Sequence, residues 1–142
     1  MRVNVGIPVW CLSDEHLRAE EQEIAMLPGF YNKVWKGKTN IPQEFTLGQG
    51  HISFFMNKKT WSLNRYRLLH EECIKRGFNI KDKSSRWKAW FPKEDINYIE
   101  TGKEKSLLID RISEKILDSN GYFHYYRTNV SKDFVINTLK LA

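Results

Sequence analysis

Apolar residues alternate with polar or small ones over the first dozen positions of the chain. The alternating apolar residues are Val3, Val5, Ile7 and Val9. A period of two is typical of extended backbone. Gly6 and Pro8 interrupt the segment, and no matching run elsewhere offers a convincing partner strand. We therefore predict an extended N-terminal arm over residues 1 to 12.

Helical spacing begins immediately after this arm. Ser13 is a favourable N-cap and is followed by two acids, which suit the first turn of a helix. The apolar stripe then continues to Leu27. Pro28 and Gly29 should end or kink the helix, and the aromatic spacing over residues 30–35 predicts that it resumes.

Three further helices follow from the same period, with loops between them. We predict a second long helix over about 59–76, a third over about 103–118, and a short last helix over 131–139. The glycine-containing segment 37–50 and the polar segment 81–103 are predicted as ordered loops. The expected fold is all-α: one compact domain over residues 1–142, with three main helices.

Charge and aromatic content point to a polyanionic partner. The formal net charge is +6, and aromatic residues make up 13% of the chain, several of them beside Lys or Arg. Cations hold phosphates while aromatic faces stack on bases, so nucleic acid is the first candidate. The alternative is that most rings are simply core.

Several other classes of protein are disfavoured. Cys11 and Cys73 form no paired framework, which fits a reduced, intracellular protein. The four histidines are scattered, so we expect no metal site. The N-terminus does not resemble a signal peptide, and no apolar run is long enough for a membrane span. We expect a cytoplasmic protein.

Two long segments carry a specific resemblance to a known family. They are Leu47-Gly48-Gln49-Gly50-His51-Ile52-Ser53-Phe54-Phe55 and Glu72-Cys73-Ile74-Lys75-Arg76-Gly77-Phe78-Asn79-Ile80-Lys81-Asp82. Both resemble segments of the phage-type pyrimidine-dimer DNA glycosylases. Shorter matches occur near the start, along the first helix and over Tyr122–Tyr126. The resemblance covers roughly residues 1–127 and leaves 128–142 outside it.

The resemblance implies a helical fold with the N-terminus threaded into its middle. It also implies a monomer that binds double-stranded DNA with a damaged base, bends it and flips a base out, with no cofactor. A phage-encoded enzyme acting inside a bacterial host would fit this family. The implied chemistry is a Schiff base between the N-terminal α-amine and the sugar, assisted by a glutamate on the first helix.

The residues in these positions suit that chemistry. An α-amine has an ordinary pKa of about 7.7–8, against about 10.4 for lysine, so a usable fraction is unprotonated at neutral pH. Met1 falls where the family has its nucleophilic residue, and we expect it to be retained because Arg2 is large. Glu23 matches the catalytic glutamate. A solvated acidic helix face is the alternative for Glu23.

The resemblance also assigns a set of DNA contacts. They are Arg2, His16, Gln22, Arg111, Lys115, Tyr122, His124, Tyr125 and Tyr126. Ordinary surface charge is the alternative for the cations, and packing against the first helix is the alternative for the tyrosines. Gln22 and Met26 replace two arginines of the family, so a different damaged base remains open as the substrate. A DNA-binding protein without catalysis and a metal-dependent nuclease using His51 also remain open.

Overall fold

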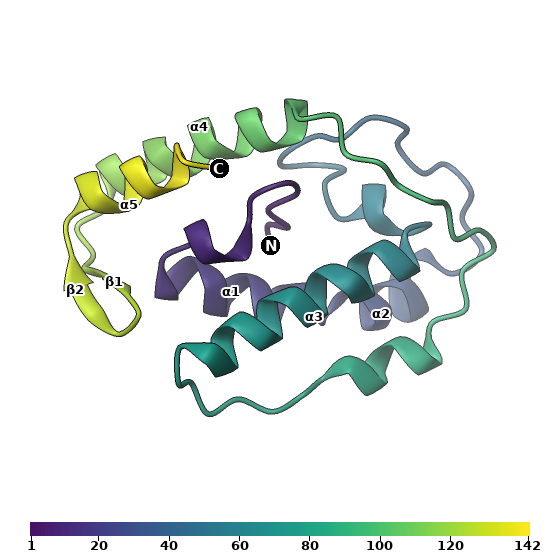
Figure 1. Cartoon of the computed structure of the whole chain (residues 1–142). Helices are drawn as coiled ribbons and strands as arrows, with labels where there is room; N and C mark the ends of the chain where they lie inside the picture. The colour runs from purple at the N-terminus through teal and green to yellow at the C-terminus, as the bar shows by residue number, and fades with distance from the viewer.

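The computed structural model describes residues 1–142 as a mostly helical domain (Figure 1). The helices are α1 (Asp14–Ile24), α2 (Leu27–Phe30), α3 (Lys59–Lys75), α4 (Lys103–Asp118) and α5 (Lys132–Leu139). The strands are β1 (Phe123–Tyr125) and β2 (Thr128–Val130). The three longest helices match the three main helices predicted. None of the helices is both long enough and apolar enough to cross a membrane.

The N-terminal arm lies in the middle of the molecule, between α1 and α3 on one side and α4 on the other (Figure 1). Val3, Val5 and Ile7 are fully buried. The arm forms no strand, and it ends in a short 3-10 helix over Val9–Cys11. Its alternating apolar residues thus fill the core from within, and without a partner strand its backbone forms local turns and also hydrogen-bonds to side chains.

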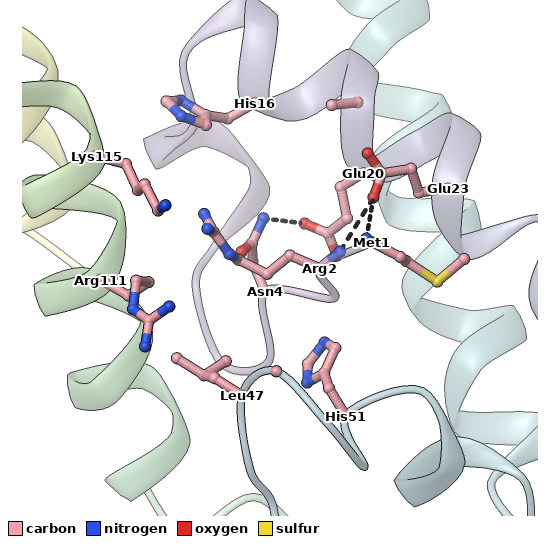
Figure 2. A pocket seen from close by; sticks show the side chains of 12 residues that line it. Met1, Arg2, Asn4, His16, Glu20, Glu23, Leu47, His51, Arg111 and Lys115 are labelled. Carbon is pink, nitrogen blue, oxygen red and sulfur yellow. Dashed lines mark hydrogen bonds and ion pairs between the residues drawn. The ribbon is translucent and has the colours of Figure 1, made fainter. Parts of the chain in front are cut away.

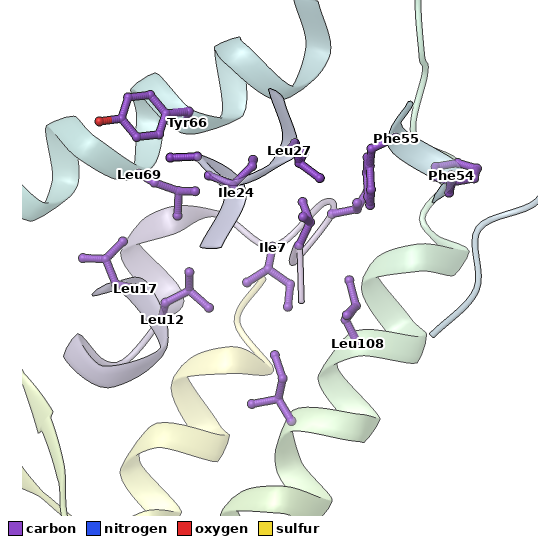
Figure 3. Close-up of a cluster of buried hydrophobic side chains, with 14 of the residues drawn as sticks. Ile7, Leu12, Leu17, Ile24, Leu27, Phe54, Phe55, Tyr66, Leu69 and Leu108 are labelled. Carbon is purple, nitrogen blue, oxygen red and sulfur yellow. The ribbon is translucent and has the colours of Figure 1, made fainter. Parts of the chain in front are cut away.

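The hydrophobic core forms where the arm meets the apolar stripes of the helices (Figure 3). Leu17 and Ile24 of α1 and Leu69 of α3 are fully buried, as is Leu108 of α4. Burying each such side chain stabilises the fold by about 1.5–3 kcal/mol. The period of these positions, three or four residues, is why the sequence revealed the helices.

The first helix starts as its cap predicts, but it breaks after Ile24, before the predicted breaker Pro28–Gly29, which lies inside the short helix α2. The Ser13 hydroxyl accepts a hydrogen bond from the His16 backbone N–H at 3.2 Å, which caps α1. The chain turns after Ile24 and re-enters a helix at Leu27. The resumption predicted beyond Pro28–Gly29 does occur, but over Tyr31–Trp35 the winding is π-helical.

A small hairpin is the departure from the predicted all-α fold. β1 and β2 pair antiparallel, with Tyr125 opposite Thr128. Tyr126 and Arg127 form the two-residue turn, and both have positive φ, at 50° and 66°. Turns of this kind usually carry Asn or Gly, so the sequence held no signal for it. The Asp14 carboxylate supplies the missing support, since it accepts hydrogen bonds from both turn N–H groups at 3.1 and 2.8 Å.

The strained turn leads to a stability prediction. Arg127→Gly should raise the free energy of unfolding by about 0.5–1 kcal/mol, because a left-handed backbone is costly for a residue with a Cβ. Thermal denaturation measures the change. Asn137→Gly, at an exposed position of α5, should instead lower stability. A decrease in stability for Arg127→Gly would show that its side chain contributes more than its backbone strain costs.

Candidate active site

A cavity of about 390 Å³ opens where the arm, α1, α4 and the 47–51 loop meet (Figure 2). Six residues predicted from the sequence line it together: Met1, Arg2, His16, Glu23, Arg111 and Lys115. The other lining residues are Asn4, Ala19, Glu20, Leu47, Gly48 and His51. The fold therefore brings the proposed nucleophile, the proposed acid/base and three cations to one place.

The amine of Met1 lies beside the carboxylate of Glu23. The two groups form an ion pair with an N–O distance of 3.6 Å. The backbone N–H of Arg2 donates a hydrogen bond to the same carboxylate oxygen, at 3.0 Å. Glu23 is partly exposed toward the cavity, so its carboxylate is held by the arm and is still open to a ligand.

A buried ion pair anchors the arm behind this contact. Arg65 of α3 binds Glu20 through two hydrogen bonds of 2.8 and 2.9 Å, and it also donates to the carbonyl of Ile7 at 2.7 Å. The Asn4 amide donates to Glu20 at 2.8 Å, while its Oδ1, buried in the cavity wall, has no protein partner. Glu20 therefore has a structural role, and the buried Asn4 oxygen is left without a hydrogen-bond partner.

His51 fixes the arm from the opposite side. Its Nε2 accepts a hydrogen bond from the Val3 backbone N–H at 2.9 Å, and Nδ1 lies 2.8 Å from the carbonyl of Thr46. The loop can present this ring because Gly48 and Gly50 have φ values of +71° and +90°. Both ring nitrogens are occupied, so His51 does not fit the metal-ligand role that the nuclease hypothesis required. No three candidate ligands cluster elsewhere in the chain.

Arg2, Arg111 and Lys115 give the rest of the cavity a positive character. Burial, followed by the charge of Arg111, lowers the pKa of Arg2, while Glu23 opposes that shift. The pair of cations favours a bound anion, whose charge would offset their mutual repulsion. A phosphate group fits this requirement.

His16 contributes a neutral ring to the cavity. Burial, reinforced by the charge of Arg2, lowers its pKa to about 4. Its Nδ1 lies 2.6 Å from the Ser13 hydroxyl, and the ring stacks on Phe123 at 5.7 Å between centroids. At neutral pH the ring is therefore uncharged and is held between α1 and the hairpin.

The other predicted DNA contacts lie outside the cavity. Gln22 is exposed and lines a separate groove of about 600 Å³. Tyr122 is 86% exposed just before the hairpin. The Nδ1 of His124 lies 2.9 Å from a carboxylate oxygen of Glu15. Contact of these three side chains with DNA remains a prediction.

Tyr125 and Tyr126 have structural partners. Their hydroxyls donate to the Trp10 carbonyl at 2.8 Å and to Glu72 at 2.7 Å. The guanidinium of Arg76 lies 4.8 and 4.7 Å from the two ring centroids. Both rings therefore pack against the protein, but on the arm and the C-terminal end of α3 rather than against the first helix, as the alternative had it. A DNA contact would have to use their exposed edges.

Sequence reasoning missed the residues that hold the arm, namely Asn4, Glu20, Arg65 and His51 as a structural group. The resemblance contained His51, but nothing in the sequence linked it to Val3. A family model described as pyrimidine dimer DNA glycosylase matches residues 2–85. The match spans the arm, α1, the 47–51 loop and α3, which is more than half of the chain. On this evidence, the chain belongs to the pyrimidine dimer DNA glycosylase family.

Proposed function

We propose that the protein is a DNA-repair N-glycosylase with abasic-site β-lyase activity on cyclobutane pyrimidine dimers, using the Met1 α-amine as nucleophile. The observation that carries the proposal is the 3.6 Å pair between this amine and Glu23, in a cavity lined by three cations. The amine supplies a nucleophile, the carboxylate can accept and return a proton, and the cations can bind the DNA backbone.

The first stage breaks the bond between base and sugar. The neutral amine of Met1 attacks C1′ of the damaged nucleotide, and the N-glycosidic bond breaks with its electron pair going to the base, which takes a proton from water. The cleaved base stays attached to its dimer partner through the cyclobutane ring. Glu23, beside the amine, takes a proton from the new ammonium and delivers it to the sugar ring oxygen. The ring then opens and leaves a protonated imine between the amine and C1′. The negative carboxylate also stabilises the cationic sugar as the bond breaks.

The second stage cuts the strand. The imine acidifies the protons on C2′, and a base removes one of them. The electron pair forms a C2′–C3′ double bond as the bond from C3′ to the 3′ phosphate oxygen breaks. Glu23 is the carboxylate nearest to the linked nitrogen, and we assign it this proton transfer as well. Water finally hydrolyses the imine and frees Met1.

A second candidate is the same chemistry on a different damaged or modified base. Gln22 on α1 and Met26 in the turn after it are exposed and lie outside the cavity, where the resemblance places two DNA-contacting arginines. An uncharged surface there would contact the lesion differently. The nucleophile and Glu23 would be unchanged, so only the preferred base would differ.

The cations lead to a DNA-binding prediction. Arg111→Met and Lys115→Met should each weaken binding and reduce the slope of log K against log salt by about 0.9, the value for one lost phosphate contact. Titrations of labelled duplex at several salt concentrations measure the slope. Lys36→Met removes a charge from an exposed position outside the cavity and should leave the slope unchanged. Equal slopes for all three variants would remove α4 from the DNA interface.

The test of the proposed function is borohydride trapping in the presence of a chelator. Borohydride reduces an imine to a stable amine, so a Schiff base becomes a permanent protein–DNA adduct. We expect an adduct and strand cleavage with duplexes carrying either a thymine dimer or an abasic site. Trapping with abasic DNA alone would favour a different lesion. Tight binding without any adduct would identify a DNA-binding protein that lacks the chemistry.

A further inference from the structure

We propose that His51 is the positioning residue for the nucleophilic amine: its neutral ring holds the backbone at Val3 so that the Met1 amine stays against Glu23. The inference rests on the proposed function, because it concerns the residue that places the proposed nucleophile. His51 does not touch the reacting atoms itself, since the arm occupies its inward-facing nitrogen.

The anchoring contact is close to the amine and well enclosed. The Val3 N–H, two residues from the chain end, donates to His51 Nε2 at 2.9 Å, and both residues are buried. Both backbone N–H groups that precede Asn4 donate to side chains: Arg2 to Glu23 and Val3 to His51. Loss of the His51 acceptor would leave Arg2 as the one backbone N–H group in this segment with an acceptor.

The ring can make this contact in only one protonation state. Nε2 must present a lone pair to the Val3 N–H, so the ring proton resides on Nδ1, where it donates to the Thr46 carbonyl. A second proton would place an N–H on Nε2 directly against the N–H of Val3. Protonation of His51 therefore breaks the anchor and displaces the arm.

The surroundings of His51 favour the neutral ring. On the arm it faces the Met1 amine and Arg2, on α1 it faces Glu20 and Glu23, and across the cavity α4 contributes Arg111 and Lys115. The rings of Phe45 and Phe55 pack edge-on against it, each at 5.3 Å between centroids. Burial is the largest cause that lowers the pKa of His51, and the Met1 amine and Arg2 add to it, while the Thr46 carbonyl and Glu20 oppose the shift.

The sign of the pH effect follows from this state. The competent form is the neutral one, and the folded pKa is below the ordinary value of 6.5. The anchor is therefore intact at pH 6.5 and above, and it is lost only as the pH falls through the lowered pKa of His51. The amine must also lose a proton to attack. The logarithm of the trapping rate should then rise with a slope of one near neutrality and steepen toward two at lower pH, where both groups are protonated.

The experiment compares two substitutions of His51 by single-turnover borohydride trapping on abasic DNA, with enzyme in excess of the dissociation constant. His51→Leu removes the acceptor and should slow trapping by about 10–100-fold, the effect of displacing a reacting group by roughly 1 Å. His51→Gln keeps an oxygen that can accept from Val3 but does not titrate. It should restore trapping to within about threefold of wild type and keep a slope of one between about pH 5 and 7, above the range in which carboxylates are ordinarily protonated.

Two controls distinguish a positioning role of His51 from a general effect on folding and from a failure of the proposed function. His70→Leu removes another part-buried histidine, which contacts Glu21 and Tyr66 and does not line the cavity; it should trap at the wild-type rate. Trapping by wild type establishes the amine chemistry first, and its absence would count against the proposed function. If wild type traps while His51→Leu matches its rate, or if His51→Gln still steepens at low pH, the positioning role is wrong.

Discussion

Replacing Glu23 by glutamine should reduce base removal from pyrimidine-dimer DNA by roughly 10²–10⁴-fold, the range for losing a positioned acid/base group. Glutamine has the same shape and can still accept the Arg2 N–H bond that Glu23 accepts at 3.0 Å. It carries no charge and transfers no proton at neutral pH. The fold and DNA affinity should therefore remain, while the charge beside the amine and the sugar disappears.

The measurement is the single-turnover rate of N-glycosidic bond cleavage in a duplex with one thymine dimer, read as strand breaks after alkali treatment because the cleaved base stays attached to its dimer partner. Glu71→Gln, at an exposed position of α3, changes the net charge equally and should retain the wild-type rate. Calorimetric or fluorescence titration checks that Glu23→Gln still binds the duplex. A rate within tenfold of wild type would mean that Glu23 holds the arm without taking part in the chemistry.

Arg76→Met should be the most destabilising single substitution of an ion pair in this protein, at a cost of about 3–5 kcal/mol in the free energy of unfolding. The buried Arg76 guanidinium binds Asp14 and Glu72, each at 2.9 Å, and donates to the Leu12 carbonyl at 2.8 Å. Its removal would leave two buried carboxylates without a countercharge. It would also remove the cation against which the rings of Tyr125 and Tyr126 pack.

Chemical denaturation measures this loss directly. Lys75→Met changes the neighbouring, exposed residue and should change stability by no more than about 0.5 kcal/mol. We also expect Arg76→Met to loosen the hairpin, because the Asp14 carboxylate that holds the turn would lose its partner. If Arg76→Met is as stable as Lys75→Met, the ion pairs of Arg76 with Asp14 and Glu72 fix the arrangement of these segments but add little to the free energy of unfolding.

The helices could be predicted because their signals are local. Ser13 precedes its own helix, and the spacing of Leu108, Ile112 and Ile116 places one apolar stripe on α4. The resemblance likewise identified Met1, Glu23, Arg111 and Lys115, which the fold brings to one cavity. Local periodicity and long motifs thus carried both the helical architecture and much of the site's composition.

The hairpin and the anchoring of the arm could not be predicted, because both depend on contacts between residues that are far apart in the sequence. The Tyr126–Arg127 turn lacks the usual glycine or asparagine and is held by Asp14, more than a hundred positions earlier. The arm is anchored by His51, 48 residues from Val3, and through Glu20 by Arg65. Neither pairing has a local pattern, since a side chain that binds a backbone group imposes no spacing on the sequence.

The central claim is that the Met1 amine forms the covalent bond to DNA. The most direct measurement is mass spectrometric mapping of the borohydride-reduced adduct after digestion. We predict that the sugar remnant resides on the α-amine of Met1, in the peptide that begins the chain. Lys115 is the other primary amine in the same cavity. A remnant on its side chain, with Met1 unmodified, would contradict the account and assign the nucleophile to α4.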